Sequence, residues 1–117
     1  MAEILVIEDD DDLREISIKM LKLAGYDVIG TNTRDEAIKI IINQPKISTL
    51  LLDISMPGLS LEDFFRQLKD HVKRLYVIFS SGEDNEVVEN FLAQNESYRF
   101  LAKPYGFSEL QEVLQSI

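Results

Sequence analysis

The fold of this chain is decided by the stretch STLLLDISMPG, residues Ser48–Gly58. Its first half is an apolar run that suits a strand buried on both faces, as in the centre of a parallel sheet. The run ends at Asp53, and the Met-Pro-Gly sequence that follows is typical of a turn. A central strand therefore brings a carboxylate to one edge of the sheet.

Two other apolar runs also end in charged residues. Ile4–Ile7 is followed by Glu8 and Asp9, and Tyr98–Ala102 is followed by Lys103 and a proline. If these segments are parallel strands, their carboxyl ends share one edge of the sheet, where ligands bind in open α/β folds. We therefore expect the three carboxylates and the lysine to meet in one site.

Strand candidates alternate with helical patterns along the whole chain. The predicted strands are Glu3–Ile7, Asp27–Gly30, Ser48–Asp53, Leu75–Ser80 and Tyr98–Ala102. The first predicted helix starts at the Asp10-Asp11-Asp12 cluster and stops at Gly25, and the second runs from a Thr33 cap to about Asn43. A third helix starts after a Ser60 cap, and a fourth runs from about Asn85 to Ala93. The last helix starts after a Ser108 cap. Five β-α units imply a parallel sheet with helices on both faces.

The first predicted helix also has a predicted buried face. Leu13, Ile16, Met20 and Leu23 recur at helical spacing, so we expect them to form the apolar stripe that packs on the sheet.

The composition suits one cytoplasmic domain that does not bind nucleic acid. The chain has 117 residues, 45% of them hydrophobic, with no cysteine and a net charge of −9. This length suits a single domain over residues 1–117. The acidic balance suits a cation or a basic partner, and the absence of cysteine fits a reducing compartment. No apolar run is long enough to cross a membrane, and the N-terminus lacks the features of a secretory signal.

The acidic residues at the predicted sheet edge suit a divalent cation. Mg²⁺ prefers oxygen ligands, and Mn²⁺ accepts the same ligand types. We expect Asp9 and Asp53 to bind the ion directly, and Glu8 to bind it directly or through water. The backbone carbonyl of Ser55 follows Asp53 by two residues, where a turning loop can point it at the ion.

The same residues suit phosphoryl transfer. The Asp53 carboxylate can attack a phosphoryl donor and become an aspartyl-phosphate, and it needs no general base because it already carries its charge. The Lys103 ammonium would hold the new phosphate as a point charge, and the Ser81 hydroxyl could donate to one of its oxygens.

Four motifs, in this order, resemble the receiver domain of bacterial two-component response regulators, the CheY-like superfamily. They are Ile4–Asp10 with the acidic pair, Leu50–Gly58 with the phosphoacceptor, Val77–Gly82 with the switch hydroxyl, and Phe100–Pro104 with the switch aromatic and the lysine. The resemblance covers essentially the whole chain. It implies a flavodoxin-like (βα)5 doubly wound sandwich whose parallel sheet has the order 2-1-3-4-5, and a cis peptide bond before Pro104.

The resemblance also implies how such a domain works. A histidine kinase or histidine phosphotransfer domain would donate the phosphoryl group to Asp53 in an Mg²⁺-dependent phosphorelay step. Ser81 would then move toward the phosphate and Phe100 would rotate inward. The face formed by the fourth helix, fifth strand and fifth helix would change for an output domain or partner protein. We expect a monomer or a weak dimer without membrane contact.

Three site positions depart from the residues that are usual in the family. Glu8 stands where Asp is more usual, Ser81 where Thr is common, and Phe100 where Tyr or His is common. We prefer Ser81 to Ser80 as the switch hydroxyl, because a small residue follows it, as in the family. The hydroxyl, the acidic pair and the aromatic ring are all retained.

Two other functions remain open from the sequence. A receiver-like module could bind partners without phosphorylation, although the complete set of site residues argues against it. An Asp-nucleophile, metal-dependent phosphatase often needs a second acid two residues beyond the nucleophile, and that position is Ser55. We therefore expect no enzyme activity beyond the domain's own phosphorylation and dephosphorylation. The chain could be a complete regulator or one domain of a longer regulator or hybrid kinase.

Overall fold

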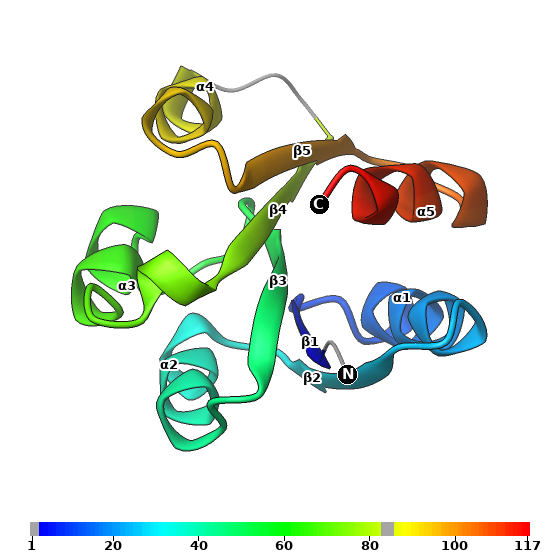
Figure 1. The fold of residues 1–117 in the computed structure, drawn as a ribbon, viewed down its shortest axis with the longest axis horizontal. Helices are drawn as coiled ribbons and strands as arrows, with labels where there is room; N and C mark the ends of the chain where they lie inside the picture. Colours follow the sequence, from blue (N-terminus) through cyan, green and yellow to red (C-terminus); the bar gives the residue numbers. More distant parts are fainter. Residues whose placement is uncertain (1–2, 83–85) are drawn as a thin grey trace.

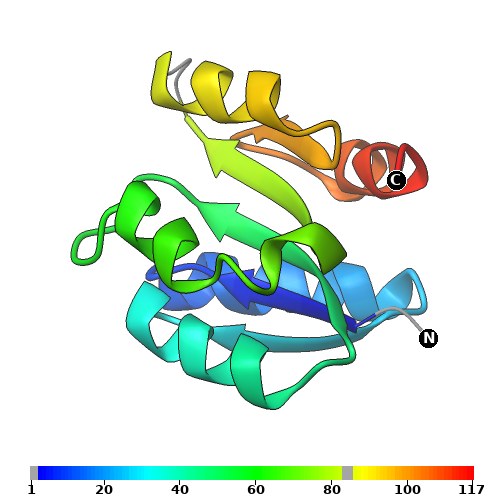
Figure 2. The ribbon, with the colours of Figure 1, turned by 60° about the vertical axis from the view of Figure 1, so that its left-hand side comes forward.

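The computed structural model describes residues 3–82 and 86–117, and these form one five-stranded parallel sheet between two layers of helices (Figures 1 and 2). The strands are β1 (Glu3–Ile7), β2 (Asp27–Thr31), β3 (Ile47–Asp53), β4 (Tyr76–Ser81) and β5 (Tyr98–Ala102). They pair in the order β2-β1-β3-β4-β5, so the predicted sheet order is confirmed. The strand with the continuous apolar run, β3, is the central one.

Helices cover both faces of the sheet (Figure 1). On the first face lie α1 (Asp11–Leu23) and α5 (Phe107–Gln115); on the second lie α2 (Arg34–Asn43), α3 (Leu61–Gln67) and α4 (Glu86–Gln94). A short 3₁₀ helix, η1 (Val72–Arg74), precedes β4. Asn85, the predicted start of the fourth helix, lies outside the described residues.

Each face of the sheet packs against its own hydrophobic cluster. In β3, Leu50 and Leu52 belong to the cluster shared with α2, α3 and α4, whereas Leu51 belongs to the cluster shared with α1 and α5. All three side chains are almost completely buried. This burial on both faces explains why the strand reads as a continuous apolar run and not as an alternating pattern.

The predicted apolar stripe of α1 is partly wrong. Ile16 is 52% exposed and Leu23 is 81% exposed, whereas Ser17 and Leu21 are the buried residues of this helix. The Ser17 hydroxyl lies 2.7 Å from the Tyr105 hydroxyl, so a polar side chain occupies a buried position of the helix. Hydrophobic periodicity contains no signal for such a contact.

The predicted start of α5 is also wrong, because Gly106 and not Ser108 is the N-cap residue. The Gly106 N–H donates to Oε1 of Glu109 at 2.7 Å, so an acidic side chain caps the helix from its third position. A glycine cap has no side chain that would mark it in the sequence. The predicted caps of the first three helices are confirmed at Asp10, Thr33 and Ser60.

Arg74 fixes the end of β3 that lies away from the predicted site. Its guanidinium donates to the carbonyl oxygens of Ile47 at 2.6 Å, Ile41 at 2.9 Å and Pro45 at 3.2 Å. These bonds tie η1 to the segment that leads from α2 into β3.

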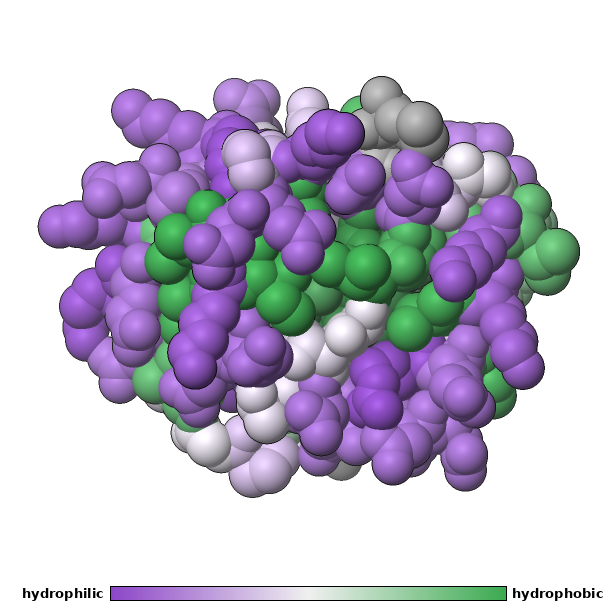
Figure 3. Space-filling model, turned by 90° about the horizontal axis from the view of Figure 1, so that it is seen from below, coloured by the Kyte–Doolittle hydropathy of each residue, from purple (hydrophilic) through white to green (hydrophobic). Residues whose placement is uncertain are grey.

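The face seen from below Figure 1 carries an apolar band between polar side chains (Figure 3). The edge strand β2 lies toward this side in Figure 1, and its Ile29 is 38% exposed. Within the described ranges, no helix combines the length and the apolar character that crossing a membrane requires.

Candidate functional site

Three predicted carboxylates lie together at the carboxyl ends of β1 and β3. Oxygen atoms of Glu8, Asp9 and Asp53 all lie within 4.8 Å of one another. Glu8 and Asp53 are 5% and 4% exposed, whereas Asp9 is open to solvent. The cluster therefore has two buried acids and a third on its solvent side.

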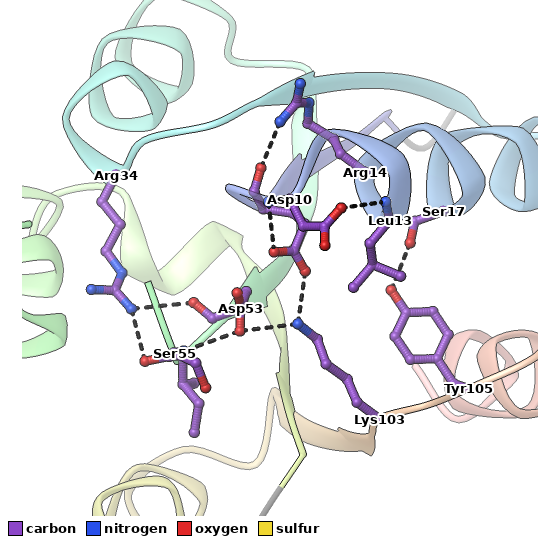
Figure 4. A network of polar contacts seen from close by, with 11 residues as sticks. Asp10, Leu13, Arg14, Ser17, Arg34, Asp53, Ser55, Lys103 and Tyr105 are labelled. Carbon is purple, nitrogen blue, oxygen red and sulfur yellow. Dashed lines mark hydrogen bonds and ion pairs between the residues drawn. The ribbon is translucent and has the colours of Figure 1, made fainter. Parts of the chain in front are cut away.

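Lys103 brings a positive charge into this cluster from the end of β5 (Figure 4). Its Nζ lies 2.8 Å from Glu8 Oε1 and 3.2 Å from Asp53 Oδ1. Its backbone N–H donates to the Ser81 carbonyl at 2.8 Å, which continues the pairing of β4 and β5 beyond the last residue of the strand. The bond to Pro104 is cis, as the resemblance implied.

Burial changes the acidity of this ion-pair network. It raises the pKa of Glu8 from 4.5 to about 7; the hydrogen bond from Lys103 opposes this rise, and the neighbouring Asp53 adds to it. Burial lowers the pKa of Lys103, but the contacts with Glu8 and Asp53 outweigh that effect, so the pKa is raised. The lysine thus stays charged at neutral pH, and Glu8 keeps its proton to a higher pH than an exposed glutamate would.

Arg14 and Gly30 shape the turn between β1 and α1. Nη1 of Arg14 donates to the Glu8 carbonyl at 2.8 Å, and the Asp10 N–H donates to Glu8 Oε2 at 3.3 Å. A Cβ at Gly30 in β2 would lie 2.7 Å from Ile18 Cδ1 and 3.2 Å from Arg14 Cδ. The glycine therefore leaves room for the two α1 side chains that cross β2 beside the acidic turn.

The loop between β3 and α3 is held by Arg34, which directly follows the Thr33 cap of α2. The Arg34 side chain is buried, and its guanidinium donates to the carbonyl oxygens of Asp53 and Ile54 at 3.2 Å each (Figure 4). It also donates to the Leu59 carbonyl at 2.6 Å. The sequence position of Arg34 was the available signal for this role. Arg34 directly follows the α2 cap, which comes after the carboxyl end of β2, so it lies at the same edge of the sheet as the site.

Ser55 contacts the predicted phosphoacceptor through its backbone. Its N–H donates to Asp53 Oδ1 at 3.0 Å, which fixes the orientation of that carboxylate. One oxygen of Asp53 thus faces both the Ser55 N–H and the Lys103 ammonium. The role of the Ser55 carbonyl as a metal ligand stays a prediction.

Both candidate hydroxyl residues end β4, and both are buried. Ser80 is in register with Asp53 on β3, and Ser81 is in register with Ala102 on β5. Among the described residues, the Ser80 hydroxyl has no hydrogen-bond partner. The choice of Ser81 as the switch residue stays a prediction.

Phe100 lies in β5, in register with Phe79 of β4. Its ring is partly buried and packs against the cluster beneath α2, α3 and α4, which is rich in aromatic side chains. Its movement on phosphorylation stays a prediction.

Comparison with known proteins assigns the fold and the family pattern. The sequence pattern of the response regulator receiver domain matches residues 4–115. The response regulator SaeR of Staphylococcus epidermidis is 26% identical over 113 residues, which are 94% of this chain and 47% of that protein. The chain therefore spans about half the length of this curated relative.

Two solved structures are similar over nearly their full length. The chemotaxis protein CheY4 of Vibrio cholerae has a TM-score of 0.87 at 20% identity, with 100% of this chain and 98% of that chain covered. A response regulator receiver protein from Pseudomonas putida has a TM-score of 0.85 at 26% identity, with 99% and 97% covered. The first likeness concerns the fold, and the second agrees with the sequence match.

Proposed function

This chain belongs to the response regulator receiver domain family of two-component signalling, and we propose that it accepts a phosphoryl group on Asp53 from a histidine of a partner kinase or phosphotransfer domain. The observation that carries this proposal is the setting of Asp53. Its buried carboxylate lies 3.2 Å from the Lys103 ammonium and within the acidic cluster at the sheet edge. Receiver domains interact with kinases and with output domains, so both partner classes follow from the family.

The proposed step is a direct displacement at phosphorus. A carboxylate oxygen of Asp53 forms the new P–O bond while the P–N bond of the phosphohistidine breaks, and the leaving imidazole nitrogen keeps the electron pair of that bond. Lys103 would hold the phosphoryl oxygens by its charge, and the Ser81 hydroxyl would donate to one of them. No general base is required.

Receiver domains typically bind Mg²⁺, and the residues of this chain fit that ion. Three carboxylates within 4.8 Å of one another supply the hard oxygen ligands that Mg²⁺ and Mn²⁺ prefer. We propose Asp9 and Asp53 as direct ligands, Glu8 as a direct or water-mediated ligand, and the Ser55 carbonyl as a further ligand. When bound, the ion would neutralise charge on the phosphoryl oxygens.

The proposed output passes through Ser81, Phe100 and the face formed by α4, β5 and α5. Movement of the hydroxyl toward the phosphate would allow the partly buried ring to turn inward, and a partner protein or output domain would bind the changed face. We propose a cytoplasmic monomer or weak dimer. The chain should bind no nucleic acid itself, because it carries a net charge of −9.

We propose no turnover of other substrates. Ser55 stands two residues beyond Asp53, where an Asp-nucleophile phosphatase often has its acid, and its N–H already bonds to Asp53. Self-phosphorylation and self-dephosphorylation would be the chain's own reactions.

Intact-protein mass spectrometry after incubation with acetyl phosphate and Mg²⁺ tests the proposal. We expect one added phosphoryl group, which EDTA abolishes and the Asp53→Ala variant does not acquire. An adduct on Asp53→Ala would move the acceptor to another residue. No adduct on the native chain, with Mg²⁺ binding shown separately by calorimetry, would favour an interaction module that works without phosphorylation.

A further inference from the structure

Arg34 is a buried cation whose guanidinium contacts backbone carbonyls, and it has no ion pair with a carboxylate in the part of the chain that the structure describes. It is 4% exposed and is the first residue of α2. Nη1 donates to the Leu59 carbonyl at 2.6 Å and lies 3.5 Å from the Met56 carbonyl; Nη2 donates to the carbonyls of Asp53 and Ile54 at 3.2 Å each. All of these acceptors belong to the end of β3 and the loop that follows it.

Burying the Arg34 charge costs free energy, and this cost points to a positional function. A charged group in a protein interior loses its hydration, and here no ion pair within the described residues compensates that loss. Burial correspondingly lowers the pKa of Arg34, and the more distant charges of Asp53 and Asp9 partly oppose that shift. The planar fork of guanidinium donors is suited to several carbonyl oxygens at once, which an ammonium is not.

The contacted carbonyls lie on both sides of Ser55. Asp53 and Ile54 precede it, and Met56 and Leu59 follow it. The Ser55 N–H in turn donates to Asp53 Oδ1. One side chain from α2 therefore fixes the backbone that carries both the predicted acceptor and the predicted carbonyl ligand (Figure 4).

We propose that Arg34 is a positioning residue of the phosphoacceptor site, whose guanidinium holds the loop from Asp53 to Leu59 in the conformation that presents the metal ligands. The inference rests on the proposed function. It opposes a simple electrostatic expectation, because a nearby positive charge would by itself weaken binding of a cation. Removing the arginine should therefore weaken Mg²⁺ binding if Arg34 positions the ligands, and should strengthen it if only the charge of Arg34 matters.

The test measures Mg²⁺ affinity by calorimetry on the unphosphorylated protein and compares three variants. Arg34→Met removes the charge and the donors but keeps a long apolar stem, and Arg34→Lys keeps the charge without the fork. Arg74→Met is the matched control, because Arg74 also donates to three backbone carbonyls, at the opposite end of β3. Removing a residue that orients metal ligands costs roughly 10- to 100-fold in affinity.

We expect Arg34→Met to bind Mg²⁺ at least about tenfold more weakly and Arg34→Lys to recover little of that loss. Arg74→Met should lose stability but keep the native affinity. Backbone hydrogen exchange in the loop from residue 53 to residue 59 should speed up in both Arg34 variants and stay unchanged in the control.

Three results would overturn the proposal. They are tighter or unchanged Mg²⁺ binding in Arg34→Met, full recovery in Arg34→Lys, and an equal loss in Arg74→Met. If Arg34→Met does not fold, the affinity and loop exchange of Arg34→Lys decide the question. Because these readouts use unphosphorylated protein, a native chain that never becomes phosphorylated would refute the proposed function without deciding the role of Arg34.

Discussion

At the scale of single residues, the site is a balance between two buried acids and one lysine. Glu8 and Asp53 share the Lys103 ammonium at 2.8 and 3.2 Å. Burial and the neighbouring Asp53 raise the pKa of Glu8, and one lysine does not fully offset them, so the site favours the protonated form of Glu8 more than solvent does. Removing Glu8's charge should therefore stabilise the metal-free protein.

The Glu8→Gln variant tests this balance through the pH dependence of stability. The folded-state pKa of Glu8, about 7, lies above the ordinary value of 4.5, so the folded protein binds this proton more tightly than the unfolded chain. The free energy of unfolding should fall as the pH rises from 4.5 to 7. In EDTA at pH 8, above both pKa values, the free energy of unfolding of Glu8→Gln should exceed that of the native chain by up to about 3 kcal/mol. Urea denaturation at each pH measures the free energy of unfolding. If it changes with pH equally in both proteins, this account is contradicted.

At the scale of elements, the sequence predicted strands and helix caps well where local chemistry decides them. The apolar run of β3 and the side-chain caps Thr33 and Ser60 are such cases. The start of α5 was missed, because a glycine backbone N–H and the Glu109 carboxylate form its cap. The rotation of α1 was missed, because one of its two buried residues is the polar Ser17, whose partner Tyr105 lies 88 positions away in the sequence.

The two candidate caps of α5 can be distinguished by mutation. Glu109→Ala should lower the free energy of unfolding by about 1 kcal/mol, because it leaves the Gly106 N–H without its acceptor. Ser108→Ala, the matched control, should change it by less than about 0.5 kcal/mol. Urea denaturation measures both, and a larger loss in Ser108→Ala would restore the cap that the sequence predicted.

At the scale of the whole molecule, strand order brings charged residues from three separated sequence motifs into one site. The convergence of Glu8, Asp9, Asp53 and Lys103 could be predicted, because each follows the carboxyl end of a parallel strand. Topology places Arg34 near the same edge, but its contacts could not be predicted, because they depend on how far one side chain of α2 reaches across the end of β3. Topology determines the positions of the residues at strand ends, whereas side-chain packing determines the positions of the residues that support them.

The clustered negative charge should make the stability of the whole fold depend on divalent cations. A ligand that binds only the folded state at 100 times its Kd adds about 2.7 kcal/mol to the free energy of unfolding. For a chain of this length, Mg²⁺ should thus raise the Tm by roughly 10 °C. NaCl at equal ionic strength is the control. If Asp9→Ala responds to Mg²⁺ as strongly as the native chain, Asp9 is not a ligand.

The most direct test of the central claim locates the phosphoryl group on the chain. The chain is treated with acetyl phosphate and Mg²⁺ and then reduced with borohydride, which converts an aspartyl-phosphate into homoserine, and peptides are sequenced by mass spectrometry. We predict homoserine at position 53 and at no other aspartate. Homoserine at Asp9 or another position, with Asp53 intact, would contradict the account.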